Sequence, residues 1–176
     1  MTADDLWRMP DDGYRTELVR GEIVKMAPAG GGHGTVAGRL HMLLAPHVHA
    51  NKLGVTGIAE AGYTLARSPD SVRAPDVSFV AREHIPPSGV PEGYWQIPPD
   101  LAVEVISPSE RPDDVQDKVI EYLSAGTRLV WLIYPRTKTV TVYRSLRNIR
   151  VLTSNDTLSG EDVVPGFACQ VSELFE

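Results

Sequence analysis

Residues 101–107 read Leu-Ala-Val-Glu-Val-Ile-Ser, an apolar strand pattern with one glutamate, Glu104, at its centre. A buried carboxylate without a partner costs several kcal/mol, because its charged form loses hydration. The simplest compensation is a divalent cation shared with a second carboxylate. The fold must therefore bring another acidic side chain to Glu104.

Two aspartates, Asp76 and Asp100, compete for that place, and a proline precedes each of them. Asp100 shares a strand face with Glu104, but four residues of strand span ~13 Å. Two carboxylates that bind one ion at ~2.3 Å must lie much closer. Asp76 belongs to a different predicted strand and approaches Glu104 at the ~4.8 Å strand spacing if the two strands are neighbours. We therefore expect Asp76 to be the partner and Asp100 to lie at the loop boundary.

Length and composition indicate one domain, residues 1–176, of a soluble globular protein, with 42% hydrophobic and 23% charged residues. No apolar stretch approaches the ~20 residues that cross a bilayer. The N-terminus lacks the basic and apolar segments of a signal peptide, so we expect a cytoplasmic protein without membrane contact. Cys169 is the single cysteine, and we expect it to be a small buried apolar residue.

The net charge of −6 argues against a protein that coats nucleic acid through positive charge alone. Residues 122–155 nevertheless contain no acidic residue. We call their basic residues the basic strip: Arg128, Arg136, Lys138, Arg144, Arg147 and Arg150. Taken alone, the basic strip is best interpreted as the solvent-exposed face of a β-meander. The sharper alternative is a strip that contacts phosphate, because arginine binds phosphate in a bidentate manner. Its nucleic-acid contacts would be Arg136, Lys138, Arg144 and Arg147.

The first half of the chain predicts a short helix capped by Thr2, and then a β-hairpin over 14–28. A glycine loop, 30–32, leads into a helix over 34–51, in which Pro46 predicts a kink or an early end.

Strands are expected at 57–66, 74–81 and 101–107, the last two separated by a long loop, 86–99. A second helix opens at Pro112 and closes at Gly126. A buried strand, 128–134, and a β-meander over 138–144 and 148–153 follow it. The expected fold class is α/β (α+β), with helices on both sides of one mixed sheet.

A hydrolytic pair of carboxylates usually also needs a cation, which positions water or offsets charge in the transition state. Ile106, two residues after Glu104 on the same strand face, cannot supply it. Lys118 lies at the edge of the apolar stripe of the second helix. Its long side chain can run along the core and present its ammonium group to the carboxylates.

Several motifs resemble one nuclease family. They are Pro75-Asp76-Val77-Ser78-Phe79-Val80, the run Pro-Asp-Leu-Ala-Val-Glu-Val-Ile-Ser-Pro-Ser over 99–109, and Lys118 with Tyr122, Ala125-Gly126 and Trp131. The N-terminal signature adds Tyr14, Glu17-Leu18, Gly21-Glu22, Met26-Ala27-Pro28 and His33. Together they resemble the Uma-type putative restriction endonuclease family, which is DUF820-like and part of the PD-(D/E)XK nuclease superfamily. The chain departs from that family's pattern at Leu129 and Tyr134, where acidic residues are common.

The resemblance implies a restriction-endonuclease-like mixed sheet and an endonuclease that uses Mg2+ (or Mn2+) to hydrolyse DNA. Asp76 and Glu104 would hold the metal with the Val105 carbonyl, and Lys118 would be a lysine displaced from strand to helix. Glu17 and His33 match recurrent family positions and would join the site. Cleavage of both strands of a duplex is most simply performed by a homodimer.

Other interpretations stay open. A catalytically weak or inactive nuclease-like domain could serve as a nucleic-acid or protein interaction module. The glycine loop with His33 could bind a nucleotide, although a loop that caps the helix is the simpler interpretation. Glu60 is either a further ligand or an exposed edge residue. Trp95 either stacks on a base or packs beneath the long loop.

Overall fold

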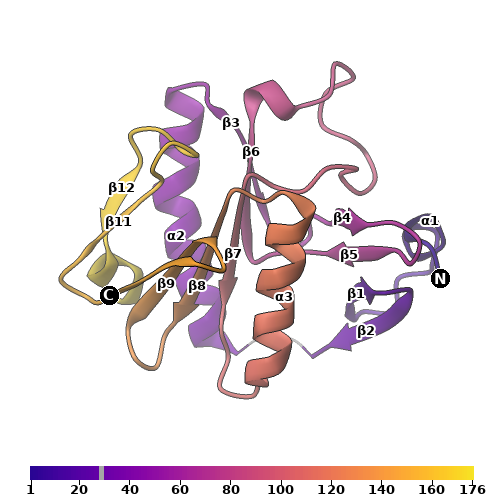
Figure 1. Ribbon diagram of the computed structural model, residues 1–176, viewed down its shortest axis with the longest axis horizontal. Helices are drawn as coiled ribbons and strands as arrows, with labels where there is room; N and C mark the ends of the chain where they lie inside the picture. Colours follow the sequence, from indigo (N-terminus) through magenta and orange to yellow (C-terminus); the bar gives the residue numbers. More distant parts are fainter. Residues whose placement is uncertain (28–29) are drawn as a thin grey trace.

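The computed structural model describes residues 1–27 and 30–176, so Pro28 at the end of the expected hairpin lies outside the described residues. Three sheets carry the strands (Figure 1). The largest has the strand order β10-β9-β8-β7-β6-β3. Its strands are β3 (Gly54–Ile58), β6 (Val77–Ala81), β7 (Leu101–Val105), β8 (Leu129–Tyr134), β9 (Thr139–Ser145) and β10 (Asn148–Leu152).

Only β7 and β8 of this sheet run parallel, and the helix α3 (Pro112–Ala125) connects them. The other neighbouring strands of the sheet are antiparallel. Because a parallel pair places the carboxyl ends of both strands at one edge, the ends of β7 and β8 lie side by side there. The segment from Glu104 to α3 starts at this edge.

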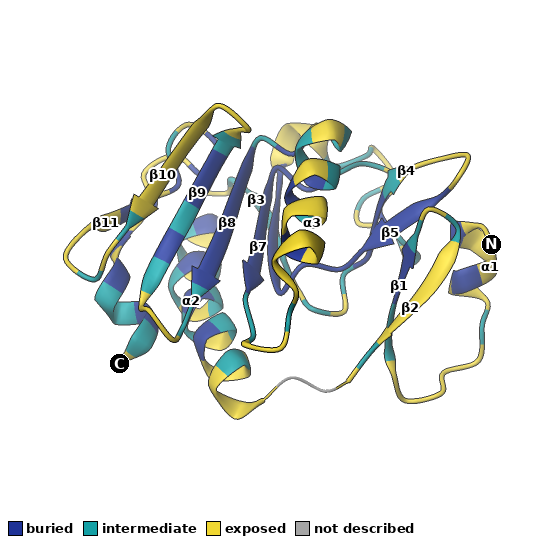
Figure 2. Ribbon diagram, turned by 60° about the horizontal axis from the view of Figure 1, so that its bottom comes forward, coloured by how far each residue is buried: buried dark blue, intermediate teal, exposed yellow. Residues whose placement is uncertain are grey.

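One helix covers each face of the large sheet, as the mixed α/β expectation requires (Figure 2). The helix α2 (Gly31–Ala50) packs Leu40 and Leu44 against Leu101 and Val103 of β7. The helix α3 packs on the opposite face, which carries Ala102. Side chains of a strand alternate between faces, so Glu104 points toward α3 with Ala102.

A smaller sheet, with the order β2-β1-β5-β4, lies beside the large one (Figure 1). Its strands are β1 (Arg15–Val19), β2 (Glu22–Met26), β4 (Tyr63–Ala66) and β5 (Ser71–Arg73), with the short helix α1 (Ala3–Trp7) nearby. The third sheet pairs β11 (Thr157–Ser159) with β12 (Ala168–Gln170). Two 3-10 helices, η1 (Arg82–His84) and η2 (Val171–Phe175), complete the elements.

One expected strand is divided between two sheets, and another is shorter than expected. The expected strand 57–66 is the end of β3 and the whole of β4, separated by a turn in which the Ala61 N–H donates to the Ile58 carbonyl. The expected strand 74–81 is β6 alone, preceded by a link from β5. Pro75 lies in that link, and proline has no N–H to donate to a ladder. Asp76 therefore stands where the chain passes from the small sheet to the large one.

The first long helix also differs from expectation. It begins at Gly31, with Gly30 as its extended N-cap, so the expected glycine loop is largely helical. Pro46 does not end the helix, which continues to Ala50. Packing of Leu44 and Val48 on the sheet outweighs the one backbone hydrogen bond that proline removes. Among the described residues, no helix is long and apolar enough to span a membrane.

The remaining expected elements agree with the structure. The N-terminal hairpin is β1 and β2, and the C-terminal meander is β9 and β10. Gly126 ends α3 in a left-handed conformation with a φ of 108°. Trp95 is buried beneath the long loop and stacks on Tyr63, with 6.1 Å between the ring centroids.

Candidate active site

Asp76 lies beside the carboxyl end of β7. The β6–β7 pairing aligns Val77 with Val103, so the next position along places Asp76 opposite Glu104. The Val105 N–H donates to Asp76 Oδ2 at 2.8 Å, which anchors the aspartate to β7. The lateral approach of Asp76 to Glu104, expected from the strand spacing, is therefore present.

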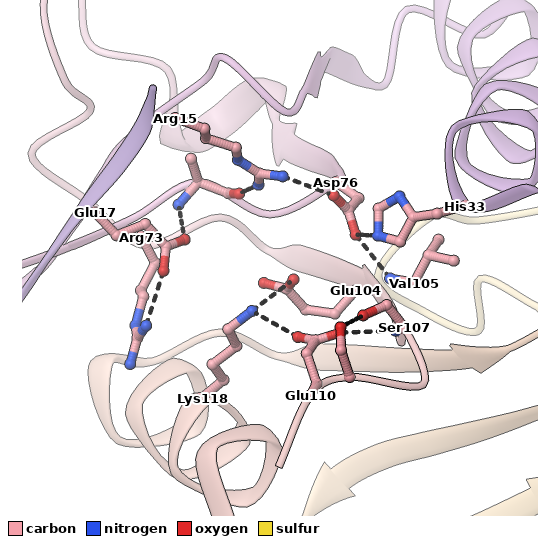
Figure 3. A network of polar contacts seen from close by, with 12 residues as sticks. Arg15, Glu17, His33, Arg73, Asp76, Glu104, Val105, Ser107, Glu110 and Lys118 are labelled. Carbon is pink, nitrogen blue, oxygen red and sulfur yellow. Dashed lines mark hydrogen bonds and ion pairs between the residues drawn. The ribbon is translucent and has the colours of Figure 1, made fainter. Parts of the chain in front are cut away.

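Two basic side chains approach the buried Asp76 from opposite sides (Figure 3). Arg15 Nη1 lies 3.0 Å from Oδ1, and His33 Nε2 lies 3.2 Å from Oδ2. Burial disfavours the charged carboxylate, but the hydrogen bonds from His33 and the Val105 N–H outweigh it and lower the pKa of Asp76. The hydrogen bond to Asp76 in turn raises the pKa of His33. Asp76 is therefore held as an anion between the Arg15 guanidinium group and the His33 imidazole ring.

Glu104 is only 3% exposed, and its pKa shifts in the opposite direction to that of Asp76. Burial raises its pKa to about 7, with further upward contributions from Asp76 and Glu17. Lys118 Nζ, at 3.3 Å from Oε2, and the Tyr122 hydroxyl, which donates to Oε1 at 2.7 Å, stabilise the anion in part. Glu104 thus changes its charge near neutral pH.

Lys118 lies between two acidic side chains, as Figure 3 shows. Its Nζ is 3.3 Å from Glu104 Oε2 and 3.3 Å from Glu110 Oε1. The other carboxylate oxygen of Glu110 accepts from the Ser107 N–H at 2.7 Å, which fixes the turn between β7 and α3. Burial lowers the pKa of Lys118, but the nearby carboxylates, Glu104 first, raise it by more, so the ammonium group stays charged. The expected contact between helix and strand is present.

A third cluster joins the small sheet to α3. Glu17 is 1% exposed, and its oxygens accept from Arg73 Nη1 at 2.8 Å and from the Ala74 N–H at 3.0 Å. Arg73 Nε also lies 2.7 Å from Glu121 Oε2 on α3. Glu17 therefore lies beside the site, as expected, but its partner in the structure is an arginine.

The donor set suits a divalent ion with few protein ligands. In the part of the chain that the structure describes, no three His, Cys, Asp or Glu side chains are arranged to hold a metal. Mg2+ usually keeps several waters and needs only one or two carboxylates, which Asp76 and Glu104 supply. The three clusters also hold five carboxylates, three permanent cations and the His33 imidazole ring.

The family model described as Uma2, putative restriction endonuclease, matches residues 3–172. This chain belongs to the Uma2 family. A crystal structure titled as a putative nuclease belonging to DUF820, from Anabaena variabilis ATCC 29413, has a TM-score of 0.87 and 22% sequence identity. The match covers 99% of this chain and 97% of that chain, and it shows that the two share a fold. No curated protein matches the chain.

Two other acidic residues that were candidates for the site of this Uma2 protein, Asp100 and Glu60, lie apart from Asp76 and Glu104. Asp100 is buried at the opposite end of β7, where it accepts from the Ala81 N–H at 2.7 Å and lies 2.9 Å from His84 Nδ1. It is thus a residue of the loop boundary, as the distance argument expects. Glu60 is exposed in the turn between β3 and β4. Among the described residues it forms no ion pair, so Glu60 is an exposed turn residue here and not a residue of an edge strand.

The basic strip is divided between two ends of β9. Arg136 and Lys138 are exposed in the β8–β9 turn, at the edge that carries the site. Arg144 lies at the far end, ~20 Å along the strand, where it pairs with Glu161 and Asp162. Carboxylates distant in the sequence therefore neutralise part of the strip. Arg147 is exposed in the β9–β10 turn at that same far end.

Sequence reasoning missed five residues that complete the three clusters: Arg15, Arg73, Glu110, Glu121 and Tyr122, the last of which it noted without giving it a role in the site. One of them carried a readable signal. Glu110 follows Ser107 by three residues, and this spacing is typical of a side chain that bonds back to the start of a turn or helix. The two arginines carried none, because they reach the site from the small sheet.

Proposed function

We propose that this Uma2 protein is a Mg2+- or Mn2+-dependent endonuclease that hydrolyses phosphodiester bonds of DNA by attack of water. One observation carries the proposal: two buried carboxylates, Asp76 and Glu104, face each other across adjacent strands with the Lys118 ammonium group beside them. Family membership supports a nucleic-acid substrate.

Asp76 and Glu104 would hold the metal, with the Val105 carbonyl as a third ligand. When bound, the divalent ion supplies Lewis-acid activation of water and neutralises phosphate charge. Lys118 orients the attacking water or offsets the charge that develops on the phosphate. Glu110 positions Lys118 by holding its Nζ at 3.3 Å from the side opposite Glu104. Arg15 and His33 hold Asp76 in the ionised form that a metal requires.

Metal binding is the first test. Millimolar Mn2+ or Mg2+ should raise the melting temperature of the wild type but not that of Asp76→Asn. Asp100→Asn is the matched control, because Asp100 is also a buried aspartate beside β7 but lies at its other end. It should respond to the metal as the wild type does. An equal response of Asp76→Asn and the wild type would contradict the proposed metal site.

Cleavage is the second test. Plasmid and single-stranded DNA are incubated with Mn2+ and the wild type, Glu104→Gln, Lys118→Met or Asp100→Asn. Removal of a group that stabilises developing charge costs about 100- to 1000-fold in rate, so Glu104→Gln and Lys118→Met should lose cleavage. Activity that persists in both variants would point to a contaminating nuclease and refute the assignment.

A nuclease-like domain without catalysis is the second candidate, and one observation favours it. Both oxygens of Asp76 already have cationic partners, Arg15 and His33, in place of a metal ion. In that case the arginine and histidine occupy the place of a metal ion beside Asp76, and the protein is a nucleic-acid or protein interaction module. DNA binding without metal-dependent stabilisation or cleavage would identify this candidate.

A further inference from the structure

A hollow of about 760 Å³ opens next to the Asp76 and Lys118 clusters, on the α3 side of the large sheet. Strand β8 supplies its floor through Leu132 and Tyr134, and Tyr143 of β9 extends it. The first turns of α3 form one wall, with Val115 and Gln116. The volume falls within the ~300–1000 Å³ that small-molecule sites occupy.

The hollow reaches the candidate active site directly. His33 and Glu110 line it, and the same two side chains contact Asp76 and Lys118. A ligand in the hollow would therefore lie beside the place where the carboxylate pair acts.

Two tyrosines give the floor its chemistry. Tyr143 pairs with Val130, and Tyr134 lies four residues further along β8 on the same face. The floor therefore runs for ~13 Å between two aromatic rings, with Leu132 between them. Leu132 and Tyr143 are buried, so the half-buried Tyr134 is the ring that a ligand can cover. Its flat face suits a nucleobase, which stacks on tyrosine without regard to sequence.

One cation stands at the rim. Arg136 is exposed in the β8–β9 turn and lines the hollow. Within the described residues, its guanidinium group forms no ion pair, in contrast to Arg144 at the other end of β9. A free guanidinium group beside an aromatic floor can bind the phosphate that is attached to a stacked base.

We propose that this hollow is a subsite for an unpaired nucleobase, so that the enzyme acts on DNA with a single-stranded or frayed nucleotide at the cleavage point. The inference rests on the proposed function, since it takes the carboxylate pair as the place of cleavage. A paired duplex hides its base faces within the stack and presents phosphates and base edges. An apolar hollow offers these polar groups little, whereas an unpaired base can enter it and stack on its floor.

Binding without metal separates this inference from catalysis. In EDTA, fluorescence anisotropy measures the affinity for a fluorescein-labelled 12-nucleotide thymidine strand and for a blunt hairpin duplex of equal length. The single strand should bind more tightly than the duplex. Tyr134→Leu should weaken single-strand binding by about 5- to 140-fold, the equivalent of one lost base stack. Tyr134→Phe keeps the ring and should bind like the wild type.

The chain offers matched controls for both groups. Tyr94→Leu changes another half-buried tyrosine, which packs against Trp7 away from the hollow, and it should leave the affinity unchanged. Arg136→Gln should weaken single-strand binding, whereas Arg8→Gln, at the end of α1 and outside the lining of the hollow, should not. A thymidine strand with one 2-aminopurine provides a readout on the wild type, because stacking on tyrosine quenches its fluorescence. That measurement remains decisive if Tyr134→Leu does not fold.

Equal affinity of the wild type for single strand and duplex would overturn the inference. So would a Tyr134→Leu variant that binds like the wild type, or a Tyr134→Phe variant that loses as much as the leucine. If these results occur while Mn2+-dependent cleavage is lost in Glu104→Gln, the hollow has another role and the nuclease proposal stands. If Tyr134 controls single-strand binding but no DNA is cut, the subsite stands and catalysis fails.

Discussion

The substitution Glu104→Gln should make the protein more stable at neutral and alkaline pH while it removes cleavage. Glutamine keeps the shape of a protonated glutamate and can still accept from the Tyr122 hydroxyl. It removes the buried charge, whose desolvation raises the pKa of Glu104 to about 7. The gain should therefore equal the free energy that the wild type loses when Glu104 ionises in the folded state.

The size of the gain follows from the two pKa values. The ordinary value of 4.5 applies to the unfolded chain, and about 7 applies to the folded protein. This difference corresponds to about 3 kcal/mol, at about 1.4 kcal/mol for each tenfold change in an equilibrium constant. Because the folded pKa is raised, the stabilising contribution of Glu104 is complete below pH 4.5 and is lost as the pH rises to about 7. Glu104→Gln does not undergo this loss.

Urea unfolding of the wild type and Glu104→Gln at pH 5, 6, 7 and 8, without metal, measures the effect. The variant should exceed the wild type by little at pH 5 and by about 3 kcal/mol at pH 8. A difference that does not change with pH would refute the raised pKa. A variant less stable than the wild type at pH 8 would show that the Lys118 and Tyr122 contacts fully compensate the buried charge.

Three further predictions concern stability. Arg73→Met leaves the two acidic partners of Arg73 without their shared cation and should lower the free energy of unfolding by about 3–5 kcal/mol in urea; a loss below about 1 kcal/mol would contradict this account of the buried ion pairs. Tyr122→Phe removes a donor to Glu104 and should raise the pKa of that carboxyl group above about 7, so that stability in the urea series continues to fall at higher pH. Gly126→Ala, at a φ of 108°, should lower the melting temperature through about 1–2 kcal/mol of strain. Gly38→Ala, inside α2 with open space around it, should instead raise it, and the same sign for both glycines would refute the argument.

The sequence predicted the part of the site that depends on strand geometry. Alternation along β7 and the spacing between strands selected Asp76 over Asp100, and the structure places both as expected. Helix periodicity similarly predicted the contact between Lys118 and Glu104, because the apolar stripe of α3 fixes which side chains face β7. Local periodicity carries this information because both contacts join neighbouring elements. The chemical roles of these residues remain proposals.

The contributions of the small sheet could not be predicted in this way. Residues 59–62, Ala-Glu-Ala-Gly, are poor strand formers and mark the β3–β4 turn, but nothing local signals that the chain changes sheet there. Arg15 and Arg73 reach the site only because the small sheet docks beside Asp76, which is a long-range packing event. The basic strip shows the same limit, since Glu161 and Asp162 fold back onto it from outside the acid-free segment.

Because Lys118 lies on a helix, its position relative to the two carboxylates can change without any change in the strands. Strand hydrogen bonds fix the register of Asp76 against Glu104, whereas the direction of Lys118 depends on the rotation of α3. One residue inserted between Pro112 and Lys118 would turn the lysine by ~100° about the helix axis and leave the strands unaltered. The cation and the carboxylates can therefore be gained, lost or re-aimed separately as sequences diverge on this framework.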